Sequence, residues 1–296
     1  MFKGSMVSII TPMHQDGSID KKSLSDLIEW HIESKTDAII AAGTTGESAT
    51  LDADEQLEVI EFVVKQVAGR IPVIAGTGSN STRTTVKLTQ NAKRAGADAC
   101  LIVTPYYNKP TQAGLYQHYK TIAESVDIPI ILYNVPGRTA CDILPDTVEK
   151  LSKIKNIIGI KEATGKIERS KEILSRCDKS FEVYSGDDPT ALELISIGAV
   201  GVISVTANVT PKEMHDMCEA ALKGNMKLAN EINQKLMMLH QRLFVESNPI
   251  PTKWVLEQMG KIESGIRLPL LPLDKKYHQE VKEAMQHAGV IEHAIH

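Results

Sequence analysis

Short apolar runs alternate with amphipathic segments along most of this chain, and this alternation limits its fold more than any other feature. Short apolar runs that end in glycine, proline or hydroxyl residues are typical of buried strands, and the segments between them repeat apolar residues at helical spacing. The strand–helix unit occurs about eight times, at a spacing of roughly 25 to 30 residues. The expected strands cover residues 5–10, 37–42, 71–75, 99–103, 129–132, 157–160, 181–184 and 201–203.

Eight such units predict an α/β protein with parallel strands, specifically a (β/α)8 TIM barrel. An open, doubly wound sheet is the alternative, but the first strand-to-helix turn lacks a GxGxxG pattern and the count of eight fits a closed barrel. The strands stop near residue 225. We therefore expect a barrel at 1–224 and a helical region at 225–296, with helices at 226–244, 252–259 and 275–287.

The C-terminal helical region could pack on the barrel or supply an oligomer surface, and the sequence is compatible with both. Its last five residues, 292–296, have no pattern that predicts a structure or a role.

Composition and charge exclude several classes of partner. The formal net charge is −4 without a long basic run, so neither nucleic acid nor an anionic membrane is expected to bind. The apolar runs are far shorter than the roughly 20 residues that span a bilayer, and no signal-peptide pattern begins the chain, so we expect a cytoplasmic protein. The four cysteines are scattered without a CxxC pair, and no two histidines have ligand spacing, which predicts no metal site.

Two neighbouring apolar runs end at reactive side chains, the fifth at Tyr133 and the sixth at Lys161. Active sites of such barrels lie at the C-terminal ends of the strands, and adjacent strands are about 4.8 Å apart. Desolvation at the rim of a buried strand favours the neutral, nucleophilic amine, and a nearby phenol can relay protons. The pair therefore suits Schiff-base chemistry with a ketone. The alternative is an ordinary lysine whose ammonium reaches water from a strand end.

Two other segments could bind carboxylates. Thr44 and Thr45 lie between Gly43 and Gly46, and positive φ angles at these glycines would turn successive N–H groups inward as an anion nest. Arg138, in the loop after the fifth run, carries a planar guanidinium that suits a second carboxylate. A plain glycine–threonine turn and a solvated arginine are the alternatives.

Three motifs together resemble those of the pyruvate-dependent class I aldolases: GTTGE at 43–47, YNVPGRT at 133–139 and GIKEAT at 159–164. The resemblance covers nearly the whole chain. It is closest to the branch that condenses pyruvate with L-aspartate 4-semialdehyde to 4-hydroxy-tetrahydrodipicolinate, in lysine and diaminopimelate biosynthesis. It implies a lyase without a bound cofactor, which works through a covalent imine between pyruvate and Lys161, and a homotetramer built as a dimer of dimers.

The resemblance also assigns roles to single residues. Lys161 would form the imine, and Tyr133 would relay protons with Thr44 and with Tyr107, which would reach in from a neighbouring subunit. In an extended chain adjacent side chains face opposite ways, so Tyr106 and Tyr107 would diverge. The substrate-binding positions would be Thr45 for the pyruvate carboxylate, Arg138 for the semialdehyde carboxylate, and Gly186 and Ile203 in the pocket lining.

Relatives that lysine inhibits bind it at a dimer interface, at positions that match Ser48, Ala49, Asn80 and Tyr106. They usually add an imidazole where this chain has Ala53 or Gln56, and a carboxylate where it has Thr84. Without that carboxylate an incoming ammonium loses a charge-assisted hydrogen bond worth roughly 1.5 to 3 kcal/mol. We therefore predict weak or absent inhibition by lysine.

Two other functions fit part of the pattern. A sister aldolase, such as N-acetylneuraminate lyase or a 2-keto-3-deoxy sugar acid aldolase, would share Lys161 and Tyr133. Arg138 separates the two, because a sugar-cleaving site needs hydroxyl contacts where this chain offers a cation. A non-catalytic barrel that only binds a keto acid is the third possibility, and it leaves the joint presence of the lysine, the tyrosine and the threonines unexplained.

Overall fold

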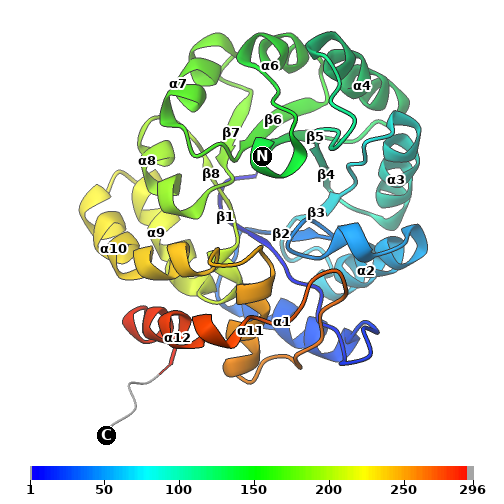
Figure 1. Cartoon of the computed structure of the whole chain (residues 1–296). Coiled ribbons are helices and arrows are strands. Elements are labelled where there is room, and N and C mark those ends of the chain that lie inside the picture. Colours follow the sequence, from blue (N-terminus) through cyan, green and yellow to red (C-terminus); the bar gives the residue numbers. More distant parts are fainter. Residues whose placement is uncertain (1, 292–296) are drawn as a thin grey trace, which may run out of the picture.

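The structure, a computed structural model, describes residues 2–291, and its eight parallel strands form a closed barrel in chain order, with β8 beside β1 (Figure 1). The predicted (β/α)8 barrel is confirmed and the open sheet is wrong. The strands are β1 (Gly4–Ser8), β2 (Ala38–Ala41), β3 (Val73–Gly76), β4 (Ala99–Val103), β5 (Ile130–Asn134), β6 (Ile157–Glu162), β7 (Glu182–Ser185) and β8 (Gly201–Ser204).

Helices follow the strands and surround the barrel (Figure 1). The α-helices of the described residues are α1 (Lys21–Glu33), α2 (Ala53–Val67), α3 (Thr82–Ala95), α4 (Gln112–Ser125), α5 (Pro136–Thr139), α6 (Pro145–Ser152), α7 (Ile167–Arg176), α8 (Ala191–Ser196), α9 (Pro211–Leu222), α10 (Met226–Arg242), α11 (Ile250–Gln258) and α12 (His278–His287). Short 3-10 turns are η1 (Ser48–Thr50), η2 (Asp188–Thr190), η3 (Thr206–Asn208) and η4 (Lys275–Tyr277).

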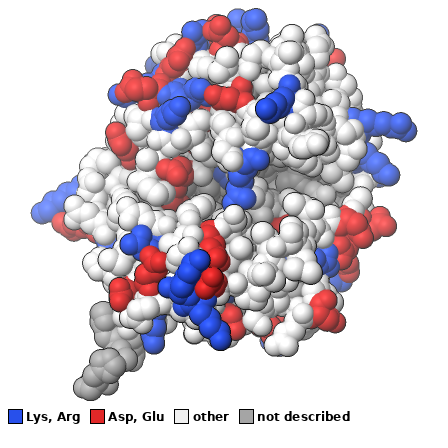
Figure 2. Space-filling view, viewed as in Figure 1, with Lys and Arg blue, Asp and Glu red and all other residues white. Residues whose placement is uncertain are grey.

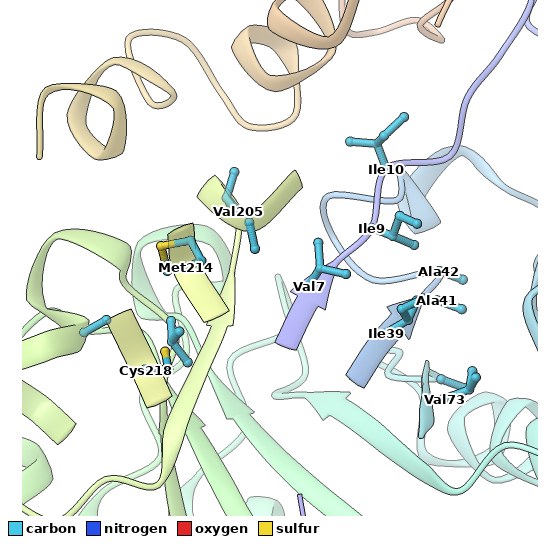
Figure 3. Close-up of a cluster of buried hydrophobic side chains, with 14 of the residues drawn as sticks. Val7, Ile9, Ile10, Ile39, Ala41, Ala42, Val73, Val205, Met214 and Cys218 are labelled. Atoms are coloured by element: carbon cyan, nitrogen blue, oxygen red, sulfur yellow. The ribbon is translucent and has the colours of Figure 1, made fainter. Parts of the chain in front are cut away.

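The strands are apolar on both faces because the barrel has two cores. Ile40 of β2 packs inside the barrel, whereas its neighbour Ile39 belongs to the larger core between the strands and the helices. Figure 3 shows this outer core, where Val7, Ile39 and Val73 of three strands face the same cluster as Met214 of α9. Burial on both faces removes the polar–apolar alternation of a half-exposed strand, which is why the sequence showed continuous apolar runs.

Strands β5 and β6 are both longer than predicted. The expected runs stopped at residues 132 and 160, but the strands continue to Asn134 and Glu162, which face each other in the ladder. The apolar runs stop before the strands do, because the last residues of both strands are polar and yet buried. Tyr133 and Lys161 therefore lie within paired strands rather than in the loops that follow.

The C-terminal helices pack on the barrel. Helix α10 lies against α9 and α12, and residues 250–256 of α11 are all buried. Helix α11 contacts α12 and the turn η3 that follows β8 (Figure 1). The division at residue 224 stays a prediction, and residues 292–296 of the expected helical region lie outside the described residues. No helix within residues 2–291 has the length and apolar character needed to cross a membrane.

Candidate active site

The predicted lysine and tyrosine meet inside the mouth of the barrel. Tyr133 of β5 and Lys161 of β6 are partners in the strand ladder, and the Lys161 Nζ lies 4.1 Å from the centroid of the Tyr133 ring. Lys161 is 5% exposed and Tyr133 is 7% exposed, and both line a cavity of about 450 Å³. An ordinary lysine that reaches water from a strand end does not fit this burial, so that alternative is wrong.

Two further predicted residues pack beside this pair. A Cβ atom at Gly186, directly after β7, would lie 2.9 Å from the Cε of Lys161, so the glycine leaves the space that the lysine side chain occupies. Ile203 of β8 is buried in the same interior cluster as Tyr133. Both residues shape the surroundings of the pair rather than the cavity wall itself.

The turn that carries Thr44 and Thr45 differs from the prediction. The positive φ angles fall at Ala42 (53°) and Glu47 (59°), not at Gly43 and Gly46. The glycines serve close packing instead: a Cβ at Gly43 would lie 3.0 Å from a serine Oγ of β1, and one at Gly46 would lie 3.1 Å from a carbonyl oxygen just after β1. The turn is therefore pressed against the end of the first strand.

The two threonines of this turn face different surroundings. Thr44 lines the cavity together with Lys161 and Tyr133. Thr45 is buried, and its Oγ1 accepts a hydrogen bond of 2.9 Å from the side-chain amide of Asn248, which precedes α11. The C-terminal region thus contacts the predicted pyruvate site directly.

A buried ion pair anchors the same turn to α11. Glu47 pairs with Lys253, whose Nζ also donates to the carbonyl oxygen of Gly265 at 2.9 Å. Burial lowers the pKa of Lys253, and the Glu47 carboxylate opposes that effect. Nearby, Arg267 donates its backbone N–H to Glu47 and holds Glu55 of α2 through two hydrogen bonds of 2.6 and 2.8 Å.

Arg138 reaches the cavity from the short helix α5. One of its Nη atoms donates to the backbone carbonyl of Asn248 at 3.1 Å. The prediction of a cationic fork beside the site agrees with this position. In Figure 2 the same face of the molecule is hollowed near its centre, and Lys or Arg atoms border the hollow.

The two adjacent tyrosines diverge, but not for the predicted reason. Tyr106 lines the cavity, whereas Tyr107 is 87% exposed. Tyr107 has a φ of 76° and donates its backbone N–H to the carbonyl of Thr139, so the chain is turned rather than extended. Within this chain Tyr107 therefore does not join Tyr133 and Thr44.

Most of the predicted lysine site opens into the same cavity. Ser48, Ala49 and Tyr106 line it, and Asn80 instead accepts a hydrogen bond from the Asn108 side chain through its carbonyl. The three positions where ionisable partners are replaced also line the cavity, and they are Ala53, Gln56 and Thr84.

A buried polar network lies on the outer face of the strands that carry the lysine and tyrosine. The Asn134 amide donates to the Glu162 carboxylate at 3.2 Å and to Asp142 at 2.9 Å, and Arg169 holds Asp142 through two hydrogen bonds. Burial raises the pKa of Glu162, and the N–H of Thr164 opposes this shift by donating to the carboxylate. The network ties together the ends of β5 and β6, directly behind Tyr133 and Lys161.

Among the described residues, one group of possible metal ligands comprises His14, Asp20 and Glu263. Asp20 is the buried member of this group, and both of its carboxylate oxygens already accept hydrogen bonds from Ser23 at the start of α1. Capping of that helix accounts for Asp20.

Sequence reasoning missed Asn248 and Lys253. Neither stands at the end of an apolar run, and both belong to the C-terminal helical region, in which the sequence predicted no site residue. The sequence offered one signal for Lys253, which is Glu47 at the end of the GTTGE motif. A glutamate so close to a buried turn needs a cation as its partner.

Comparisons with known proteins identify the family of the chain. The sequence profile of the Dihydrodipicolinate synthetase family matches residues 1–288. The 4-hydroxy-tetrahydrodipicolinate synthases of Pseudomonas putida and Pseudomonas savastanoi pv. phaseolicola are 62% and 60% identical to the chain, and each match covers 98% of this chain and all of the relative. A crystal structure of the chloride-inhibited dihydrodipicolinate synthase from Acinetobacter baumannii, complexed with pyruvate, has a TM-score of 0.97 and 53% identity, and the match covers 98% of this chain and 100% of that chain.

The barrel and the buried lysine–tyrosine pair at its mouth, taken with these matches, define an enzyme of the class I aldolase type. Within that class, the chain belongs to the Dihydrodipicolinate synthetase family. The family predicted from the three motifs is confirmed.

Proposed function

We propose that this chain condenses pyruvate with L-aspartate 4-semialdehyde to give 4-hydroxy-tetrahydrodipicolinate, the first committed step of lysine and diaminopimelate biosynthesis. The observation that carries the proposal is the buried Lys161 amine, 4.1 Å from the Tyr133 ring centroid inside a closed barrel. The relatives with about 60% identity over 98% of the chain are named for this reaction.

The arrangement suits imine chemistry. The neutral Lys161 amine attacks the C2 carbonyl of pyruvate, and the Tyr133 phenol passes a proton to the carbinolamine oxygen, which leaves as water. Loss of a proton from C3 converts the imine to an enamine, and this carbon attacks the aldehyde. The amino group of the semialdehyde portion then attacks the imine carbon and displaces Lys161, which closes the ring and frees the enzyme.

The two substrate carboxylates have separate partners in this scheme. Thr45 holds the pyruvate carboxylate, and Arg138 holds the carboxylate of the semialdehyde. Arg138 lies at the cavity, beside the imine pair, which favours this reaction over cleavage of a polyhydroxylated sugar acid.

Assembly is part of the same proposal. We assign the enzyme to the cytoplasm, without a cofactor, as a homotetramer built from two dimers. In one subunit Tyr107 is 87% exposed, and in a dimer its phenol would extend the proton relay of a neighbouring site, next to Tyr133 and Thr44.

Trapping of the imine tests the mechanism. Incubation with pyruvate and borohydride should add one reduced pyruvate to Lys161, as located by mass spectrometry of proteolytic peptides, and Lys161→Ala should gain no mass. An unmodified Lys161 in the wild-type protein would refute the imine and leave a barrel that only binds a keto acid.

A coupled assay tests the substrate. Turnover of pyruvate with aspartate semialdehyde should exceed turnover with N-acetylmannosamine or glyceraldehyde by orders of magnitude. The opposite preference would identify a sister aldolase instead.

A further inference from the structure

Asn248 contacts both residues that are proposed to hold substrate carboxylates. Its side-chain amide donates to the Thr45 hydroxyl at 2.9 Å, and its backbone carbonyl accepts from Arg138 at 3.1 Å. Asn248 is 4% exposed and comes from the segment before α11, 203 residues from Thr45 in the chain. We infer that Asn248 is a positioning residue that fixes the direction of the Thr45 hydroxyl for pyruvate binding. This inference rests on the proposed function.

The inference depends on the number of protons that a hydroxyl carries. A threonine hydroxyl has one proton to donate and two lone pairs that accept. Because the Asn248 amide occupies a lone pair of the Thr45 Oγ1, the Thr45 proton must point elsewhere. In the proposed site, this proton is the donor that remains for the pyruvate carboxylate.

Thr252 contacts the other end of the same amide. Its hydroxyl donates to the Asn248 Oδ1 at 3.4 Å, while the Nδ2 group of Asn248 faces Thr45. All three side chains are buried, which limits competition from water for these contacts. The Glu47–Lys253 ion pair holds α11 against the same turn and keeps Asn248 in place.

The two contacts of Asn248 can be separated by mutation, because one uses the side chain and the other uses the backbone. Asn248→Ala removes the donor to Thr45 but keeps the carbonyl that Arg138 contacts. We expect the KM for pyruvate to rise about tenfold, as for loss of a hydrogen bond that orients a group toward a charge. The KM for the semialdehyde should stay within about twofold, and kcat should change far less than the pyruvate KM.

Asn248→Asp provides an isosteric comparison. A carboxylate only accepts, so it would draw the Thr45 proton away from pyruvate and also repel the substrate, and the KM for pyruvate should rise at least as much as in Asn248→Ala. Asn225→Asp is the matched control. Asn225 caps α10 by accepting from the N–H of Leu228, and aspartate caps equally well, so both KM values should remain at the wild-type level.

A double-mutant cycle with Thr45→Val distinguishes positioning from general damage. If Asn248 acts through Thr45, then Asn248→Ala should have almost no further effect on the pyruvate KM once the Thr45 hydroxyl is absent. A full additional rise in the Thr45→Val background would overturn the inference, and so would a pyruvate KM that Asn248→Ala leaves unchanged.

Thr252→Val keeps Asn248 and only loosens its amide, so it tests the inference even if Asn248→Ala does not fold. We expect a rise of the pyruvate KM in the same direction as for Asn248→Ala, but smaller, and an unchanged value would contradict the role of the amide. Borohydride trapping of the wild-type enzyme separates the two proposals. No adduct would refute the proposed function as a whole, whereas an adduct with unaltered KM values in the variants would refute only the role of Asn248.

Discussion

The two sides of the cavity are built in different ways. One side, the imine side, holds the pair proposed to form the imine. There Tyr133 of β5 and Lys161 of β6 are partners in the strand ladder. On the carboxylate side, Thr45 lies in a turn that depends on side chains more than 200 residues further along the chain. Strand register therefore places the two residues proposed to react, whereas long-range side-chain contacts place the residues proposed to hold the substrate.

Removal of the phenol should give the largest effect on the imine side. Tyr133→Phe keeps the ring beside Lys161 but removes the proton relay, so kcat should fall roughly 100- to 10,000-fold, the usual contribution of a positioned acid–base group. Pyruvate should still bind and be trapped slowly by borohydride. Steady-state kinetics provides the measurement, and unchanged turnover would exclude Tyr133 from the mechanism.

The carboxylate side should be most sensitive to loss of its buried ion pair. Lys253→Met leaves the Glu47 carboxylate buried without its cation, which should lower the free energy of unfolding by about 3–5 kcal/mol, as measured by urea titration. Replacing both residues, as Glu47→Gln with Lys253→Met, should recover much of that loss. The matched control is Lys223→Met, which breaks an exposed pair with Glu219 and should cost less than about 1 kcal/mol. Equal losses in the two single variants would contradict a greater contribution from the buried pair than from the exposed pair.

Acid should lower the free energy of unfolding through His31, which belongs to neither side of the cavity. Burial in α1 lowers the pKa of His31 to about 3 from 6.5, so in this range the folded state binds fewer protons than the unfolded state. His31 therefore contributes stability that is fully present above pH 6.5 and is lost progressively as the pH falls toward about 3.

Between pH 7.5 and pH 5, the unfolding free energy of the wild-type protein should fall by about 2 kcal/mol more than that of His31→Gln. Denaturant titrations of both proteins at the two pH values provide the measurement. Parallel losses would show that His31 does not control the acid response.

The smallest effect is expected from lysine, whose predicted site includes Ser48 and Ala49 at the cavity. Lysine at sub-millimolar concentration should reduce turnover by less than half, because Ala53, Gln56 and Thr84 offer no ionised partner. Thr84→Glu should increase the sensitivity, since it restores an acceptor for the ammonium. Half-inhibition of the wild-type enzyme below 1 mM would contradict the prediction.

The imine side was largely predictable from the sequence. The alternation of strands and helices depends on local periodicity, so strand β4 was placed at its observed bounds, Ala99–Val103. The order of the strands then made Tyr133 and Lys161 neighbours. The remaining error concerned the strand ends, because Asn134 and Glu162 are polar and are buried by contacts with each other and with Asp142.

The carboxylate side could be predicted only in part. Its residue types indicated anion binding, but the glycines of the turn were assigned positive φ angles that Ala42 and Glu47 adopt instead. Close packing against β1 is a tertiary property, and no local pattern reveals it. Asn248 was missed for the same reason, since its partner Thr45 is 203 residues away.

The late position of Asn248 and Lys253 has a consequence for synthesis on the ribosome. At roughly 5–20 residues per second, the ribosome needs about 2 to 10 s to extend the chain from the end of β8 at Ser204 to Lys253. During that interval all eight strands and Lys161 have been made, but Thr45 and Glu47 still lack their partners. A nascent chain therefore carries the lysine proposed to react with pyruvate before it carries the residues that complete the proposed carboxylate site.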